Sequence, residues 1–216
     1  MARRLPGADG SVSTKIALDG VGGQGVRLIA GVMGALLARM GKEVTVLFDY
    51  DSSVRGSMSD AFLIFDDRPI ANPVVEEADI MLKLADKGHL RIHGRKVVAD
   101  LGLDVPGAEQ IPFASLGSQQ FGKELFGNMI ALGRILRLAQ IEFDEDAIRE
   151  SLPRRYVEEN VAAIRFGYDL TDEEIARLAG AAPPSRFQMN TAATAATHER
   201  MISAGHGVAE REPLEG

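Results

Sequence analysis

Short apolar runs separated by polar turns dominate the first hundred residues, and one longer stretch among them has helical periodicity. The run Lys15–Leu18 precedes a glycine-rich turn and predicts a short, buried strand. From Leu28 to Met40 large apolar residues recur three and four positions apart, which predicts an amphipathic helix that ends at Gly41. Further apolar runs that predict strands cover residues 43–48, 61–65, 79–84 and 95–99, with a short helical piece over 87–92.

The second half of the chain changes to helical periodicity. Apolar residues there predict helices over residues 116–126, 128–139, 145–152, 157–166 and 172–179. Thr171 followed by Glu174 forms a capping box at the start of the last of these helices. The first half of the chain thus contains strands with a helix between them, and the second half contains helices. This order predicts an α/β fold. We therefore expect one three-layer, Rossmann-like domain with a helical second half.

The two ends of the chain differ in composition from the middle. Residues 1–13 are polar and predict a loose leader, which leaves 14–180 as the domain. Residues 181–216 contain a Pro-Pro pair and a Thr/Ala-rich stretch, with few large apolar side chains and no periodicity. Such a segment cannot bury enough apolar surface to fold alone. We expect it to form an extended C-terminal arm that lies along a partner subunit.

Composition narrows the class of protein. The chain has 216 residues, of which 45% are hydrophobic, and this is enough for one well-packed domain. Its 24 basic and 31 acidic residues give a net charge of -7, which argues against a nucleic-acid partner. No apolar run is long enough to span a membrane, so we expect a cytoplasmic protein. The absence of cysteine excludes disulfides, thiol nucleophiles and cysteine-ligated iron–sulfur clusters in this chain.

A glycine-rich turn joins the first predicted strand to the first predicted helix. Gly20, Gly22 and Gly25 fit the pattern G-x-G-x-x-G, in which glycines let the backbone approach a phosphate at a helix N-terminus. Asp49 ends the second strand and could hold a ribose hydroxyl, as in a dinucleotide-binding protein. However, the second strand leads through a loop into another strand, where a dinucleotide-binding unit has a helix. A tight turn without any ligand is the other interpretation of these glycines.

Three segments in order carry a resemblance to a known family. They are Gly20-Val-Gly-Gly-Gln-Gly25, Val54-Arg-Gly-Ser57 and Asn128-Met-Ile-Ala-Leu-Gly133. Together they resemble the gamma subunit of the 2-oxoacid:acceptor oxidoreductases, over roughly residues 15–170. That family includes the pyruvate, 2-oxoglutarate, ketoisovalerate, indolepyruvate and arylglyoxylate enzymes. Tyr50-Asp-Ser-Ser53 stands where members often have Tyr-Gly-Pro-Glu, which points to a different 2-oxoacid.

The resemblance implies a hetero-oligomeric enzyme that oxidatively decarboxylates a 2-oxoacid to an acyl-CoA. It implies thiamine diphosphate, [4Fe-4S] clusters and coenzyme A in the complex, with electrons passing to ferredoxin or NAD. The implied partners are alpha and beta subunits and a ferredoxin-like subunit. This chain would hold no cofactor alone and would be inactive alone. A free-standing dinucleotide-binding enzyme and a non-catalytic assembly subunit are the alternatives.

The expected ligand-binding residues lie in two loops, and no catalytic or metal-ligating residue is expected. They are Gly20, Gly22, Gly23, Gln24, Gly25, Tyr50, Arg55, Gly56 and Ser57. Arg55 could pair with a phosphate or carboxylate, or form a salt bridge to Asp51 or Asp60. We expect Asn128 to cap the helix that follows it. His89 and His93 are four residues apart but lie among basic residues, so a surface pair is favoured over a metal site.

Overall fold

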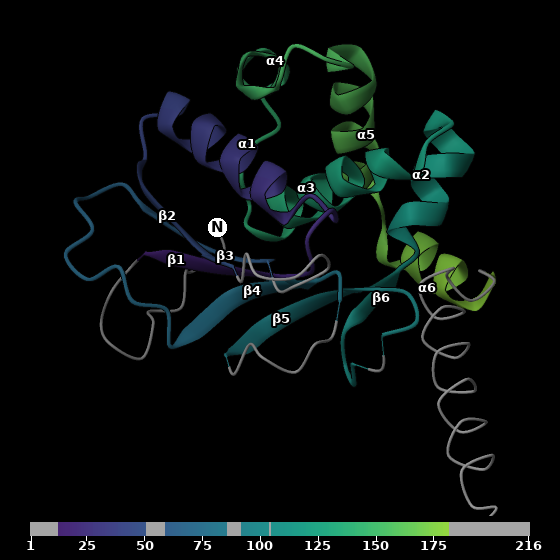
Figure 1. Cartoon of the computed structure of the whole chain (residues 1–216), viewed down its shortest axis with the longest axis horizontal. Helices are drawn as coiled ribbons and strands as arrows, with labels where there is room; N and C mark the ends of the chain where they lie inside the picture. Colours follow the sequence, from purple (N-terminus) through teal and green to yellow (C-terminus); the bar gives the residue numbers. More distant parts are fainter. Residues whose placement is uncertain (1–12, 51–58, 86–91, 104, 182–216) are drawn as a thin grey trace, which may run out of the picture. The chain divides into compact units, whose positions relative to one another are not determined.

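A mixed six-stranded sheet forms the base of the domain (Figure 1). The computed structural model describes residues 13–50, 59–85, 92–103 and 105–181. The strands are β1 (Thr14–Asp19), β2 (Glu43–Tyr50), β3 (Ser59–Asp66), β4 (Glu77–Lys83), β5 (His93–Asp100) and β6 (Glu109–Ile111). Their order across the sheet is β2-β3-β1-β4-β5-β6.

The helices follow the strands as predicted, mainly in the second half. They are α1 (Val26–Arg39), α2 (Phe113–Phe121), the 3-10 helix η1 (Glu124–Phe126), α3 (Gly127–Leu138), α4 (Glu145–Ser151), α5 (Val157–Asp169) and α6 (Asp172–Ala181). Figure 1 shows the helices gathered on one side of the sheet, with α6 beside β6.

Strand directions bring several strand ends to one edge of the sheet. β3 is antiparallel to both of its neighbours, β1 and β2. β1, β4, β5 and β6 are parallel to one another. The carboxyl ends of β1, β2, β4 and β5 therefore lie at the same edge, where β3 begins. We call this the carboxyl edge.

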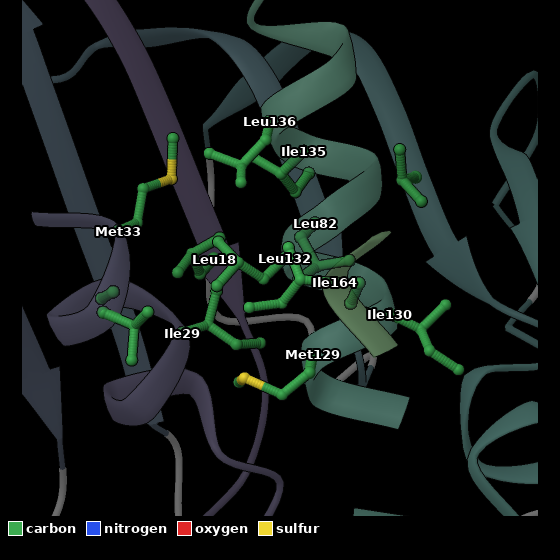
Figure 2. Packing of buried hydrophobic residues seen from close by; sticks show 14 of the residues in the cluster. Leu18, Ile29, Met33, Leu82, Met129, Ile130, Leu132, Ile135, Leu136 and Ile164 are labelled. Carbon is green, nitrogen blue, oxygen red and sulfur yellow. The ribbon is translucent and has the colours of Figure 1, made fainter. Parts of the chain in front are cut away.

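One large hydrophobic cluster fills the space between the sheet and the helices. Figure 2 shows its centre, where Leu18 of β1 and Leu82 of β4 meet Leu132 of α3. Each of the six α-helices in the described ranges contributes to this cluster. A smaller cluster on the other face contains Ala17, Ala78 and Met81, with partly buried strand and loop residues around them.

The α/β class and the helical second half are confirmed, but the number of layers differs from the prediction. Within the described residues the helices cover one face of the sheet, which gives two layers in place of three. The predicted helical piece over 87–92 falls almost wholly outside the described residues, as does the predicted arm.

In the second half of the chain one predicted helix needs correction, one strand was missed, and the predicted capping box is confirmed. The helix predicted over 116–126 is two helices, because Gly122 adopts a left-handed conformation (φ 77°) that ends α2. β6 was not predicted. The capping box before α6 is present: the Thr171 N–H donates to Glu174 Oε2 (2.9 Å), and the Glu174 N–H donates to Thr171 Oγ1 (3.3 Å).

A buried arginine joins β6, α3 and α6. Only 4% of Arg134 is exposed. Its guanidinium donates to both carboxylate oxygens of Glu109 (2.7 and 3.0 Å), to the Leu170 carbonyl (2.9 Å) and to Asp172 (3.1 Å). A buried charge must be paired, because desolvation without partners costs several kcal/mol. These contacts therefore fix a three-residue strand and the start of α6 to the central helix.

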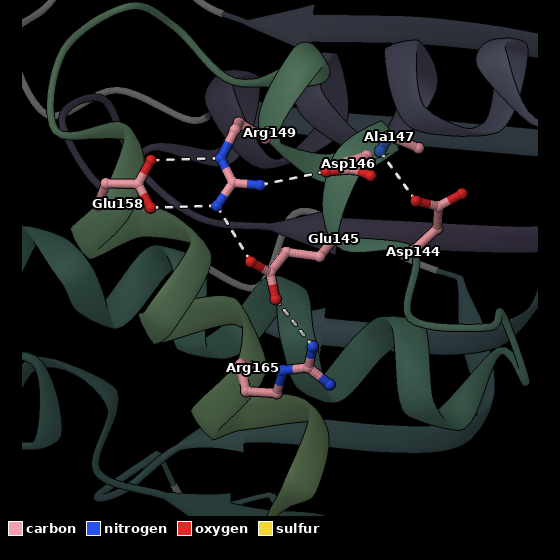
Figure 3. A network of polar contacts seen from close by, with 7 residues as sticks. All are labelled: Asp144, Glu145, Asp146, Ala147, Arg149, Glu158 and Arg165. Atoms are coloured by element: carbon pink, nitrogen blue, oxygen red, sulfur yellow. Dashed lines mark hydrogen bonds and ion pairs between the residues drawn. The ribbon is translucent and has the colours of Figure 1, made fainter.

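An exposed ion-pair network connects α4 to α5 (Figure 3). Arg149 contacts Glu145 (3.0 Å) and Asp146 (3.4 Å) on its own helix and Glu158 (3.1 Å) on α5. Arg165 of α5 reaches back to Glu145 (3.1 Å). Because all these side chains are in contact with solvent, each pair contributes little to stability, typically about 0–1 kcal/mol. The network orients α4 and adds less to stability than the apolar packing beneath it.

Two glycines allow α3 and α5 to approach closely. A Cβ at Gly133 would lie 2.0 Å from the Ile164 carbonyl oxygen, and one at Gly167 would lie 1.9 Å from the Ile130 carbonyl oxygen. Both contacts are with backbone, so a side chain at either position would force the helices apart. The Gly133 end of the third sequence segment therefore has a packing role.

We predict that Gly133→Ala lowers the free energy of unfolding by about 1–3 kcal/mol, because it overpacks the contact between α3 and α5. Gly31→Ala is the matched control, since a Cβ at this exposed position of α1 meets nothing within 4 Å. That variant should be neutral or more stable by up to about 1 kcal/mol. Urea denaturation of both variants measures the difference. Equal effects would contradict the close helix contact.

Candidate site at the carboxyl edge

The glycine loop, residues 20–25, connects β1 to α1 at the carboxyl edge. Gly25 is left-handed (φ 77°, ψ 15°), a conformation that glycine adopts without strain, and α1 starts at the next residue. The Gln24 side chain accepts from the Val21 N–H (2.8 Å) and donates to the Leu84 carbonyl after β4 (2.8 Å). Gln24 therefore has a structural role, because it ties the loop to the neighbouring strand. Gly22 and Gly23 are exposed.

The amino terminus of α1 favours a negative charge. In the described part of the chain no side chain caps it, and its first turn contains no acidic residue. The first N–H groups of a helix have no partner within the helix, and they carry the positive end of its dipole. The glycine loop thus presents backbone donors of the kind that bind phosphate or carboxylate groups.

The second predicted loop ends beside the glycine loop. Tyr50 is the last residue of β2, and Ser59 is the first residue of β3. The Ser59 N–H donates to the Gly20 carbonyl (3.0 Å), so β3 begins in direct contact with the glycine loop. The two loops therefore leave the same edge, as topology predicted. Arg55, Gly56 and Ser57 lie outside the described residues.

Asn128 has a different position from the predicted one. Its helix, α3, begins at Gly127, and the residue before it, Phe126, already has helical dihedral angles (φ −73°, ψ −12°). An N-cap residue needs a non-helical backbone, so Asn128 cannot act as the cap. Instead its side chain lies against the glycine loop: a Cβ at Gly25 would be 2.2 Å from Asn128 Nδ2. Sequence periodicity gave no signal for this contact.

The geometry argues against a dinucleotide site. Asp49, the candidate ribose ligand, is exposed on β2 and lies opposite Asp60 of β3 in the sheet register. Because β3 lies between β2 and β1, Asp49 is separated from the glycine loop by a whole strand. In dinucleotide-binding folds the strand with the acidic residue is the direct neighbour of the first strand.

Charged groups also lie on the helix-free face near this edge. Asp19 and Asp60 are buried there, and Lys83 Nζ lies 3.6 Å from Asp19 Oδ2. Among the residues that the structure describes, no group of three or more His, Asp or Glu side chains could hold a metal ion. His93 belongs to strand β5, which removes the helical spacing considered for it.

Asp100 at the end of β5 is the most perturbed carboxyl group at this edge. Burial raises its pKa from 3.8 to about 7, although the N–H groups of Phe113 and Ala114 donate to it and oppose the rise. These donors belong to the first turn of α2. Asp100 therefore occupies the amino terminus of α2, in contrast to α1, where no side chain of the described ranges does so.

Fold and site together define an open α/β domain that has a loop of the anion-binding type at its carboxyl edge. Its strand order differs from that of a dinucleotide-binding protein. The chain belongs to the pyruvate ferredoxin/flavodoxin oxidoreductase family, whose model matches residues 15–170. This confirms the resemblance inferred from the three sequence segments. The chain is thus a component of a 2-oxoacid oxidoreductase, and the alternative of a free-standing dinucleotide-binding enzyme is not supported.

Individual proteins that are similar to this chain belong to enzymes of the same kind. The 2-oxoglutarate synthase subunit KorC of Archaeoglobus fulgidus is 29% identical over 161 residues, which cover 72% of this chain and 86% of that protein. The gamma subunit of a keto/oxoacid ferredoxin oxidoreductase from Geobacter sulfurreducens has the same fold. Its TM-score is 0.59 at 22% identity, with 77% of this chain and 98% of that chain covered.

A larger relative contains the fold as part of a longer polypeptide. This is the 2-oxoglutarate:ferredoxin oxidoreductase from Magnetococcus marinus with 2-oxoglutarate, coenzyme A and succinyl-CoA bound. The match has a TM-score of 0.57 at 18% identity and covers 80% of this chain but 32% of that one. No helix in the described ranges of our chain is long and apolar enough to cross a membrane.

We predict that Asp100 makes stability depend on pH. The folded chain binds the proton of the Asp100 carboxyl group more tightly than the unfolded chain does. The resulting contribution to the free energy of unfolding is therefore complete below pH 3.8 and is lost as the pH rises through about 7. Asp100→Asn mimics the protonated carboxyl. Its free energy of unfolding relative to the wild type should therefore increase by about 1–3 kcal/mol between pH 5 and pH 8. Parallel urea titrations of the two proteins at both pH values test this, and a constant difference would contradict it.

Proposed function

We propose that this chain is the gamma subunit of a thiamine diphosphate-dependent 2-oxoacid oxidoreductase, and that its carboxyl edge contributes to the binding of coenzyme A at a subunit interface. The observation that carries the proposal is the hydrogen bond between Ser59 and Gly20, which brings the start of β3 onto the glycine loop. Two loops that the family resemblance singles out thus leave one edge of the sheet. Ligands of open α/β domains bind at such an edge.

The chemistry of this edge suits an anionic acceptor. Coenzyme A carries phosphate groups, and the amino terminus of α1 offers backbone donors to one of them. Arg55 would add a charge-assisted contact from the loop between β2 and β3. Gly20, Gly22, Gly23 and Gly25 would allow the phosphate to approach the backbone, and Gln24 would hold the loop in place through Leu84. Tyr50, Gly56 and Ser57 would shape the second loop.

Partner subunits would supply the redox chemistry. The chain contains no cysteine, so [4Fe-4S] clusters would be held by a beta or ferredoxin-like subunit. Thiamine diphosphate supplies the carbanion chemistry of decarboxylation and would lie between alpha and beta subunits. In the Magnetococcus marinus protein the match to our chain covers 32% of one longer polypeptide, so there the same fold is joined to other parts. In our protein the remaining parts would come from separate chains in the cytoplasm.

We predict that Arg55→Ala raises the KM for coenzyme A by roughly tenfold to a hundredfold in the reassembled complex, because a charge-assisted contact is worth about 1.5–3 kcal/mol. The KM for the 2-oxoacid should change much less. Steady-state kinetics with both substrates varied separately give the two values. Arg68→Ala is the matched control, since this exposed arginine follows β3 at the opposite edge of the sheet.

Two results would contradict the ligand role of Arg55. An unchanged KM for coenzyme A in a fully assembled complex would remove Arg55 from the acceptor site. Loss of assembly on gel filtration, with normal kinetics in the fraction that still assembles, would place Arg55 at a subunit interface.

We also predict that the isolated chain neither reduces a dye in the presence of a 2-oxoacid nor absorbs near 400 nm. The reason is the absence of cysteine together with a fold whose described residues form no metal site. The absorbance spectrum and a dye-reduction assay of the purified chain test this, with the reassembled complex as the positive control. Activity of the chain alone would refute its role as a non-autonomous subunit.

A further inference from the structure

The third sequence segment, Asn128–Gly133, is explained only in part by packing. Gly133 at its end permits the contact between α3 and α5. Met129 and Ile130 are buried in the main cluster, as Figure 2 shows. Asn128 is half-buried, and its side chain lies against Gly25 at the far end of the glycine loop. Packing of the core accounts for the neighbours of Asn128 but does not require an amide at this position.

The α3 helix provides a rigid base for the Asn128 side chain. It is anchored by Gly133 against the backbone of α5 and by the buried Arg134 against β6 and α6. By contrast, Gly22 and Gly23 in the glycine loop are exposed and can move more easily. A contact between a fixed helix and a short glycine-rich loop restricts the loop. The amide of Asn128 therefore limits the positions that Gly25, the residue before α1, can adopt.

Charge explains why an amide suits this position better than a carboxylate. The amino termini of α1 and α3 meet here, and among the described residues neither has a side-chain cap or an acidic residue in its first turn. A carboxylate would stabilise both helix ends through their dipoles. It would also place a negative charge beside a loop that has to accept an anionic group. An amide has the same shape as the carboxylate and no charge.

We propose that Asn128 is a positioning residue: it holds the glycine loop through its contact with Gly25 and keeps the loop neutral for the anionic acceptor. This inference rests on the proposed function of the carboxyl edge. It assigns a role to a residue that lies outside both predicted loops, and it links the core helix α3 to acceptor affinity.

The isosteric variant Asn128→Asp separates positioning from stability. In the reassembled complex we expect an unchanged or higher melting temperature, because a carboxylate is favourable at helix amino termini. We expect the KM for coenzyme A to rise at least about tenfold from charge repulsion, with kcat nearly unchanged. Asn128→Ala removes the contact without adding charge and should raise the same KM by a smaller factor. Gln119→Glu, an exposed amide-to-acid change on α2, is the matched control for net charge.

The outcomes distinguish this inference from the proposed function. An unchanged KM for coenzyme A in Asn128→Asp, together with a raised KM in Arg55→Ala, would overturn the role of Asn128 and leave the site in place. Unchanged values in both variants would overturn the site itself. If Asn128→Asp fails to assemble, Asn128→Ala and Asn128→Ser decide: a KM equal to the wild type in both would refute the proposal.

Discussion

The antiparallel pairing of β3 with β1 determines where the other parts of the candidate site lie. Five residue pairs hold the two strands together, and the Ser59–Gly20 hydrogen bond extends the contact into the glycine loop. Because β3 runs opposite to β1, it must begin where β1 ends. In a dinucleotide-binding unit the second strand would occupy this place. Here the insertion of β3 moves β2 to the outside of the sheet and brings a different connection to the carboxyl edge.

The helical layer supports this edge through α3. One end of the helix meets the glycine loop at Asn128, and Arg134 in its middle binds β6 and α6. Between these polar contacts the helix is buried among the apolar residues of the main cluster. The loops thus rest on an element with little freedom to move. Pre-organised donors of this kind cost less to order when a ligand binds.

Sequence patterns predicted those elements whose structure depends on neighbouring residues in the chain. Helical spacing and Gly41, which is left-handed in the structure (φ 75°), located α1 and its end. The G-x-G-x-x-G pattern between a predicted strand and a predicted helix located the glycine loop. Contacts between distant segments could not be predicted in this way. β6 has three residues and exists because β5 and Arg134 hold it, and the N-cap rule failed at Asn128 because η1 already enters the helix. The packing of Asn128 on Gly25 depends on how two helices meet, which periodicity does not encode.

The Arg134 contacts also couple the unfolding of separate elements. If α6 detached, the guanidinium would lose Asp172, and if β6 detached, it would lose Glu109. Either event leaves a buried charge with fewer partners, which is strongly unfavourable. β6 and α6 are therefore expected to open together as one cooperative unit. In hydrogen exchange, the amides of this short edge strand should thus be protected to the same degree as those of a helix that follows them by some sixty residues in the chain.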